Sequence, residues 1–434
     1  MPPECPADVC RARRHGRTMV IVSFVVFAVV RGDQAITGIL IQPLREIFNV
    51  STAAVLSSTT GSLALMVGLL SPLCGLLLQR LSIRTVLSLA AAAVALGYCA
   101  LAYASQLWHV VIVYGVLFAG AVAATSLAVN ALITNWFAQD RGLAMGIASA
   151  GSSLVAAIAP PAAAASIASA GFTPTMLGFG IGAFLIVPVV NALVVDRPEQ
   201  ESLRGPDVSS AHNDSAMDRS RQGDATRLTV AQTLRSTRFW SITGIAGVTA
   251  AIGSALANNI VPLGQSLGVD RQAAAYLVSS VAVGTAAGMV GFGKLLDVLS
   301  QRAAVRLLIV CLALPCLLLA RESSYFVMVI GAALLGLGAG ATAVVPFFLC
   351  SANFGAGGFA VASSTMMPFL CLLIVATVTV CGYTYDIYAT YDYALTAALL
   401  ALAITFLATV LLPGRADPRP ANLTHGVQGA SHEN

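Results

Sequence analysis

Two charged residues, Arg31 and Asp33, lie within the otherwise apolar stretch "FAVVRGDQAITGILIQPL" at positions 27–44. A charged side chain inside a bilayer costs roughly 2.5–3.5 kcal/mol even on the scale derived from membrane insertion, so such residues indicate function. A guanidinium can bind a carboxylate through two parallel hydrogen bonds. A carboxyl group can gain and lose a proton. The pair therefore predicts anion binding at Arg31 and proton transfer at Asp33.

The spacing of the two residues separates their side chains on a helix. Helical positions two apart point about 200° from one another, so Arg31 and Asp33 cannot pair along one face. Arg31 shares a face with Gln34 and Ala35, and Asp33 shares one with Thr37. Gln34 is therefore a further candidate for substrate binding. The alternative is structural, with each charge satisfied by a different neighbouring helix or with Arg31 reaching toward the outer headgroups.

The composition of the chain excludes a water-facing surface. Of 434 residues, 57% are hydrophobic and only 10% are charged, and the mean hydropathy is +0.84. Soluble domains have about 25% charged residues. Apolar runs of about 20 residues, the length that a helix needs to cross a bilayer, recur throughout. The chain is predicted to be an all-α, multi-pass membrane protein whose partner is the lipid bilayer.

No motif for catalysis, metal binding or nucleotide binding occurs in the sequence. The nine cysteines form no CxxC pair and join no histidine cluster, so neither a metal site nor a disulfide is predicted. We expect no enzymatic activity, no cofactor and no nucleic-acid partner. Any transport by this chain would be driven by a gradient.

Twelve membrane spans are predicted in two sets of six. The first half, 19–195, contains spans at 19–42, 54–78, 85–104, 108–132, 142–166 and 175–195. The second half, 239–412, contains spans at 239–263, 273–296, 303–320, 324–349, 360–382 and 393–412. A tail at 1–18, a polar linker at 196–238 and a tail at 413–434 complete the predicted organisation.

The positive charges predict the orientation of these spans. If the N-terminus is cytoplasmic, nineteen of the 23 lysines and arginines lie on the cytoplasmic side, and only Arg45, Arg271 and Arg321 lie outside. The remaining arginine, Arg31, lies within the membrane. Both termini are therefore predicted to be cytoplasmic, in a plasma or bacterial inner membrane.

The two halves resemble each other in sequence. "QPLREIFNVSTAA" (42–54) parallels "VPLGQSLGVDRQAA" (261–274), and "GLLLQRLSIR" (75–84) parallels "GKLLDVLSQR" (293–302). Such repeats are typical of transporters whose halves rock around a central site. Asn258 and Asn259, in the seventh span where the halves should face one another, are further candidates for substrate binding.

The second repeat also resembles the GxLaDrxGrR signature of the major facilitator superfamily. The resemblance implies twelve helices, alternating access, and structural or gating roles for six residues: Gly75, Arg80, Arg84, Gly293, Asp297 and Arg302. Gln79 replaces the signature acid in the first copy, so a charged contact is expected only at Asp297. Tyr114 occupies the region where many proton-coupled members have an arginine, so no proton relay is expected there.

Further stretches resemble the bacterial monocarboxylate and oxalate/formate carriers. These are "VVDRPEQESLRGPD" (194–207), "LRSTRFWSI" (234–242), "NWFAQDRGLAMGIASAGSSL" (135–154) and "GYTYDIYATYDYALTAAL" (382–399). The resemblance implies a proton-coupled carrier of small organic anions, and we expect the carrier to be monomeric. However, "GDQAITGILIQPL" resembles the first helix of spinster-like lipid carriers. An exporter of drugs or lipid-like amphiphiles, or a receptor that binds a solute without transporting it, remains an alternative.

Overall fold

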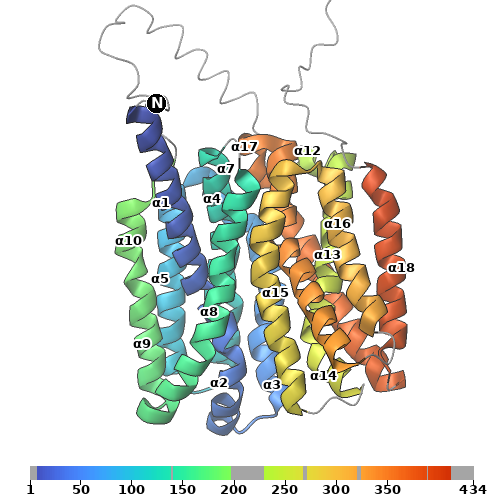
Figure 1. Ribbon diagram of the computed structural model, residues 1–434. Helices are drawn as coiled ribbons and strands as arrows, with labels where there is room; N and C mark the ends of the chain where they lie inside the picture. The colour runs from blue at the N-terminus through green and yellow to red at the C-terminus, as the bar shows by residue number, and fades with distance from the viewer. Residues whose placement is uncertain are drawn as a thin grey trace, which may run out of the picture.

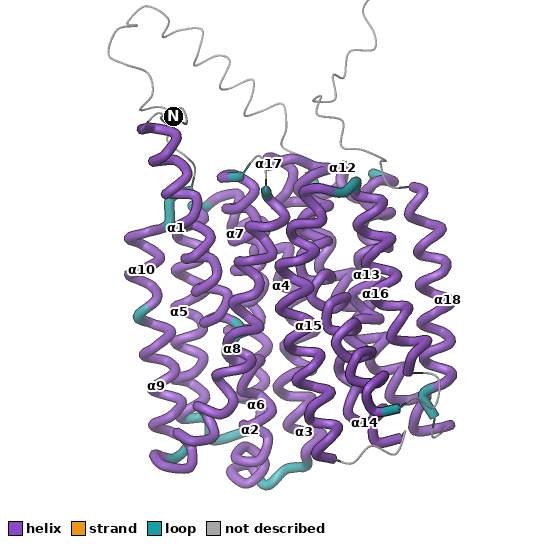
Figure 2. Tube along the Cα trace, in the orientation of Figure 1, coloured by secondary structure: helices purple, strands orange, loops and turns teal. Residues whose placement is uncertain are grey.

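The computed structural model describes residues 7–137, 140–196, 229–266, 271–319, 324–388 and 390–411. Within these ranges the chain is helical and contains no strand (Figure 2). The predicted C-terminal tail and most of the predicted linker lie outside the described residues. The predicted N-terminal tail is helical from Ala7, so the first helix begins earlier than the apolar pattern indicates.

The first half forms a bundle of long, roughly antiparallel helices (Figure 1). Its elements are α1 (Ala7–Val30), α2 (Gly32–Phe48), α3 (Thr52–Leu56), η1 (Ser57–Gly61), α4 (Ser62–Arg80), α5 (Ile83–Ala102), α6 (Leu107–Ile112), η2 (Val113–Phe118), α7 (Ala119–Trp136), α8 (Arg141–Ala170), α9 (Phe172–Phe184) and α10 (Ile186–Leu193). The segments η1 and η2 are π-helical. Such wide turns are rare in proteins and are frequent at functional sites.

The second half packs beside the first and has the same helical character (Figure 1). Its elements are α12 (Val230–Arg235), α13 (Thr237–Asn258), α14 (Ile260–Ser266), α15 (Arg271–Val298), α16 (Gln301–Leu319), α17 (Tyr325–Tyr388), α18 (Asp392–Ala408) and a final 3-10 turn, η4 (Thr409–Leu411). The helix α17 contains the predicted spans 324–349 and 360–382. Gly355, with φ 64° and ψ −178°, separates them.

The number of spans agrees with the prediction. Ten helical stretches of the described chain are long and apolar enough to cross a membrane. One of these, Tyr325–Tyr385, contains two spans that Gly355 separates, and the shorter apolar helix Asp392–Ala408 follows. Counting α17 as two and including α18 reaches the predicted twelve.

Equivalent contacts in the two halves reflect the internal repeat. In the first half, the Ser88 hydroxyl donates to Asn191 Oδ1 at 3.2 Å. In the second half, Arg306 Nε donates to Thr409 Oγ1 at 3.0 Å. Both residues of the second pair lie 218 positions beyond those of the first, which is the offset that relates Gly75 to Gly293. The repeated sequence therefore folds into repeated tertiary contacts.

The outer surface of the bundle is apolar, as a lipid-facing surface must be. Leu69 and Leu407, for example, are 63% and 72% exposed. The interior instead contains many alanines and glycines, which allow helix backbones to approach closely where no water drives association. This distribution places polar side chains between helices, where the candidate site lies.

Candidate functional site

Arg31 lies at a break in the first membrane span. It separates α1 from α2, with φ −89° and ψ 2°, so the helix is interrupted at the charged residue. Its guanidinium donates from Nη1 to Gln34 Oε1 at 3.2 Å and from Nη2 to Ser126 Oγ of α7 at 3.3 Å. The predicted shared face of Arg31 and Gln34 is thus observed. These two bonds hold the guanidinium in place with other N–H groups left to donate.

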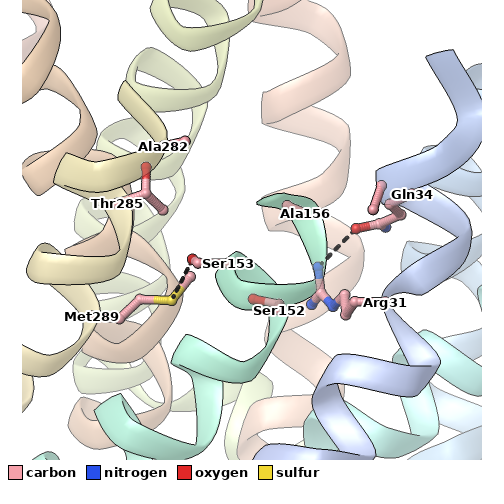
Figure 3. Close-up of a pocket in the computed structure, with 9 residues that line it drawn as sticks. Arg31, Gln34, Ser152, Ser153, Ala156, Ala282, Thr285 and Met289 are labelled. Carbon is pink, nitrogen blue, oxygen red and sulfur yellow. Dashed lines mark hydrogen bonds between the residues drawn. The ribbon is translucent and has the colours of Figure 1, made fainter. Parts of the chain in front are cut away.

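A cavity of about 310 Å³ lies between the two halves beside this guanidinium (Figure 3). The first half and α15 of the second half both contribute to its wall. The lining residues are Arg31, Gln34, Ala35, Ser152, Ser153, Ala156, Ala282, Thr285 and Met289. The hydroxyl of Ser153 donates to Met289 Sδ at 3.6 Å, which joins α8 to α15 at the edge of the cavity. A solute bound here would therefore contact both halves.

Arg31 is the one charged residue among those that line this cavity. Gln34, the two serines and Thr285 add uncharged polar groups, and the rest of the wall is alanine and methionine. Ligand sites combine mostly apolar walls with a few converging polar groups. The guanidinium fork matches a carboxylate in both charge and geometry. The cavity is thus suited to a small, singly charged organic anion.

Asp33 lies apart from the cavity, inside the first half. Its side chain is fully buried, and neither carboxyl oxygen has a hydrogen-bond partner. The Thr37 hydroxyl donates to the Asp33 backbone oxygen at 2.7 Å and lies 3.3 Å from the Tyr114 hydroxyl. A buried charge needs hydrogen bonds or a counter-charge. The backbone N–H groups of Asp33 and Gln34 lie near the carboxyl group, so ionisation of Asp33 requires side-chain donors to come within reach as well.

The structure does not bring Asn258 and Asn259 to the cavity at Arg31. Asn258 is exposed at the end of α13, and its amide donates to Ser254 O at 2.9 Å. The Asn259 amide donates to Ala255 O at 2.8 Å, and its Oδ1 accepts from the Tyr391 hydroxyl at 3.4 Å. Both amides thus satisfy backbone groups where α13 ends. Of the predicted substrate-binding residues, only Arg31 and Gln34 come together.

The two halves approach most closely at the end of the spans where α8 begins and α15 ends. A Cβ atom on Gly142 would overlap the backbone oxygen of Gly293, and one on Gly146 would overlap that of Met289. The symmetry-related Gly75 of α4 packs against Ser364 of α17, where a Cβ would overlap the serine side chain. Hydrogen alone fits at these positions. The predicted structural role of Gly75 and Gly293 is therefore close packing between the halves.

Asp297 adds a charged contact at this closed end. Its carboxyl oxygens accept hydrogen bonds from the backbone N–H groups of Gly142 and Leu143, each at 2.8 Å. These N–H groups belong to the first turn of α8, where the helix dipole favours a negative charge. Asp297 therefore connects the second half to the first. Gln79, its counterpart in the repeat, is exposed.

The remaining signature residues lie at helix ends. Arg80 ends α4 and is exposed, and Arg302 lies in the first turn of α16. The Arg84 side chain donates to the backbone oxygen of Asn191. The Asp196 carboxylate accepts from the backbone N–H groups of Ile83 and Arg84, at 3.1 Å each. Arg84 therefore anchors α5 to the end of the sixth span.

We expect Gly146→Ala to destabilise the protein by roughly 1–3 kcal/mol, because overpacking forces two backbones apart. This cost exceeds the gain of about 1 kcal/mol that alanine brings to a helix interior. Gly182→Ala, in α9, is the matched control because no atom lies within 4 Å of its added Cβ. Thermal unfolding in detergent should show a lower Tm for the first variant only. Equal Tm values would mean that the helices separate without cost.

Sequence reasoning missed several residues of the site. Ser126, Ser152, Ser153, Thr285 and Met289 contact Arg31 or line the cavity. The run "AGSSL" in α8 carries two hydroxyls in an otherwise apolar span, which is the available signal for Ser152 and Ser153. Ser126, Thr285 and Met289 have no such signal. Only helix packing brings them to the site.

The fold and the cavity define a multi-pass helical membrane carrier with a polar site between two related halves. Residues 22–246 match the family model of the Major Facilitator Superfamily. This match spans more than half of the chain, so the protein belongs to the Major Facilitator Superfamily and is a transporter rather than an enzyme.

Solved structures of the same fold cover nearly the whole chain. The E. coli fucose:proton symporter FucP aligns with a TM-score of 0.65 at 15% identity, over 91% of this chain and 97% of FucP. The human organic anion transporter MFSD10 aligns with a TM-score of 0.66 at 16% identity, over 91% and 99%. The MFS-type transporter hasB of Aspergillus fumigatus is 45% identical over 62 residues, a stretch that spans 14% of each chain.

Proposed function

We propose that this transporter moves a small organic anion, with monocarboxylates as the favoured class, together with protons. The observation that carries the proposal is the placement of Arg31 as the one charge in the cavity lining, two residues from a buried and unpartnered Asp33. FucP is a proton symporter and MFSD10 an organic anion transporter by their names. At 15–16% identity these likenesses support the fold alone, so the substrate is argued from Arg31.

Anion binding begins with the fixed guanidinium. An incoming carboxylate can accept from N–H groups that Gln34 and Ser126 leave free, or displace Gln34 from Nη1. The hydroxyls of Ser152, Ser153 and Thr285 can bond polar substituents of the same solute. A single cation in the lining favours one negative charge over two, because a second buried carboxylate would have no counter-charge.

Proton coupling follows from the electrostatic interaction between Arg31 and Asp33. When Asp33 is protonated, its negative charge no longer offsets the guanidinium, and the anion is attracted more strongly. By thermodynamic reciprocity, a bound anion makes protonation of Asp33 more favourable by the same factor. Anion and proton therefore bind together and leave together. This is the behaviour of a symporter.

Alternating access requires the two halves to separate at the closed end. The Asp297 contact with α8 and the glycine packing would be broken in that step and restored afterwards. The charge distribution supports a cell-membrane location with both termini cytoplasmic, which makes the closed end the cytoplasmic one. Each chain contains a complete cavity, which supports a monomeric transporter.

The decisive experiment encloses a pH-sensitive dye in vesicles that contain the purified protein and adds a panel of carboxylates outside. At least one carboxylate should acidify the interior faster than in protein-free vesicles, because undissociated acids also cross bilayers unaided. Asp33→Asn should weaken the protein-dependent signal at least fivefold, because an amide cannot carry the proton.

Three outcomes would contradict the proposal in whole or in part. If no carboxylate produced a protein-dependent signal, the exporter of amphiphiles would become the better reading. Binding without flux would instead indicate a receptor. If vesicles with Asp33→Asn acidified as fast as those with the unmodified protein, proton-coupled anion transport would stand, but Asp33 would not be part of the proton pathway.

A further inference from the structure

The environment of Asp33 contains two buried tyrosines from separate helices. Tyr98 of α5 and Tyr114 of η2 are 3% and 1% exposed, and both hydroxyls interact electrostatically with the Asp33 carboxyl group. Their rings pack on Phe118, with centroids 5.2 Å and 5.0 Å from it. This aromatic packing holds the rings and their hydroxyl oxygens in place, while the hydroxyl protons can reorient.

Tyr98 approaches the chain directly before Asp33. A Cβ atom on Gly32 would lie 3.4 Å from the Tyr98 hydroxyl oxygen. The absence of a side chain at Gly32 therefore allows this hydroxyl to lie close to the start of α2. Tyr98 Oη is thus positioned beside the residue whose carboxyl lacks donors.

The direction of the hydrogen bond at Tyr114 follows from counting protons. The Thr37 hydroxyl has one proton, and it donates that proton to the Asp33 backbone oxygen at 2.7 Å. In the contact of 3.3 Å between Thr37 Oγ1 and Tyr114 Oη, the donor must therefore be Tyr114. Thr37 thus accepts the Tyr114 proton while the Asp33 carboxyl has no partner.

Few other ionisable groups face Asp33. Arg31, on the same segment, is the charged group that interacts with it. Within the described residues, α7, α3 and η1 contain no titratable side chain. The one titratable residue of α8, Arg141, is the first residue of that helix and lies at the closed end of the bundle. Beside the backbone N–H groups of Asp33 and Gln34, the side-chain groups that can respond when the carboxyl group ionises are therefore two hydroxyls and one guanidinium.

We propose that Tyr98 and Tyr114 are positioning residues of the proton site, whose hydroxyls donate to Asp33 when it ionises, and that Thr37 holds the Tyr114 proton until then. The inference rests on the proposed proton transfer at Asp33. A turn of the Asp33 carboxyl group toward the two hydroxyls, with reorientation of their protons, provides side-chain donors to a carboxylate that otherwise has none, with no helix movement. Tyr114 lies in the π-helical η2, and its hydroxyl reaches Thr37 of α2.

The test measures protonation of Asp33 without any substrate. Infrared difference spectra of the reconstituted protein, recorded as the pH is varied, report the carboxyl C=O band, and Asp33→Asn identifies the band by removing it. Tyr98→Phe and Tyr114→Phe should each raise the midpoint pH of this band by roughly half a unit to one unit, because each removes a donor to the carboxylate. Tyr325→Phe, which removes a bond to Ala273 O in the other half, should leave the midpoint unchanged.

Thr37→Val provides a variant with the opposite expected sign. It keeps the side-chain shape but removes the acceptor that competes for the Tyr114 proton, so the midpoint should fall. The inference would be overturned if both tyrosine variants left the midpoint pH unchanged, or if Thr37→Val raised it. If Tyr98, Tyr114 and Thr37 only stabilised the fold, their replacement would lower the Tm and would not shift the midpoint pH in opposite directions. If Asp33→Asn removed no band while transport kept its proton dependence, the proposed function itself would fail at Asp33.

Discussion

Arg31→Ala should reduce the initial rate of anion uptake at subsaturating substrate by about two to three powers of ten. In the proposed complex, Arg31 and the bound carboxylate form a buried, hydrogen-bonded charge pair. Truncating one partner of such a pair costs roughly 3–4 kcal/mol, much of it from the charge left unpaired. The loss should appear mainly in KM, since the guanidinium binds the ground-state anion. The uptake rate of Arg31→Lys should lie between those of the wild type and Arg31→Ala, because an ammonium keeps the positive charge but cannot form the two parallel hydrogen bonds of a guanidinium.

Two control variants separate binding from folding in this experiment. Ser126→Ala removes the helix contact of Arg31 and leaves the charge in the cavity, so uptake should fall less than tenfold. Arg235→Ala removes an exposed arginine of α12 and should have no effect. If Arg31→Ala and Ser126→Ala lost uptake equally, Arg31 would be a structural residue that joins α2 to α7.

Asp297→Ala should raise the equilibrium constant for opening of the closed end by about one to two powers of ten. The substitution leaves the backbone N–H groups of Gly142 and Leu143 without an anionic acceptor, which costs roughly 2–3 kcal/mol in the closed state alone. Spin labels at Leu81→Cys and Leu299→Cys, one exposed position in each half, would report the change in separation. The nine native cysteines would first be replaced by alanine.

Gln79→Asp is the complementary variant. It restores an acid at the symmetry-related position of the repeat, next to the α17 segment against which Gly75 packs. The added charge should favour the closed state and shorten the mean label distance. A label distance that does not change in Asp297→Ala would show that glycine packing alone holds the halves together at this end.

The fold was largely predictable because membrane spans depend on apolar runs of fixed length. The twelve spans and the two halves follow local signals in the sequence, whereas the interruption between α1 and α2 at Arg31 was not predicted, because the span 19–42 reads as one continuous apolar run. The opposite placement of Arg31 and Asp33 also followed from helical geometry, since their spacing is a local property. The start of α1 at Ala7 was missed because the polar residues before Thr18 carry no apolar periodicity.

The site was only partly predictable because its walls come from distant segments. Arg31 and Gln34 are one turn apart, so their contact could be predicted. Thr285 and Met289 reach the same cavity through packing between halves, which depends on glycines at Gly142 and Gly146. Tyr114, which contacts Thr37 one turn from Asp33, lies in a π-helical turn, for which the sequence offers no signal.

Alanine makes up a third of the cavity lining, at Ala35, Ala156 and Ala282. Each can be enlarged in single steps, and one methylene group in a binding pocket changes discrimination between substrates by roughly 1–3 kcal/mol. Substrate choice is thereby separated from charge recognition: point substitutions at the wall could redirect the transporter from one carboxylate to another while Arg31 and Asp33 remain unchanged. The cavity is in this sense evolvable, with its solute range set by residues that have no part in coupling.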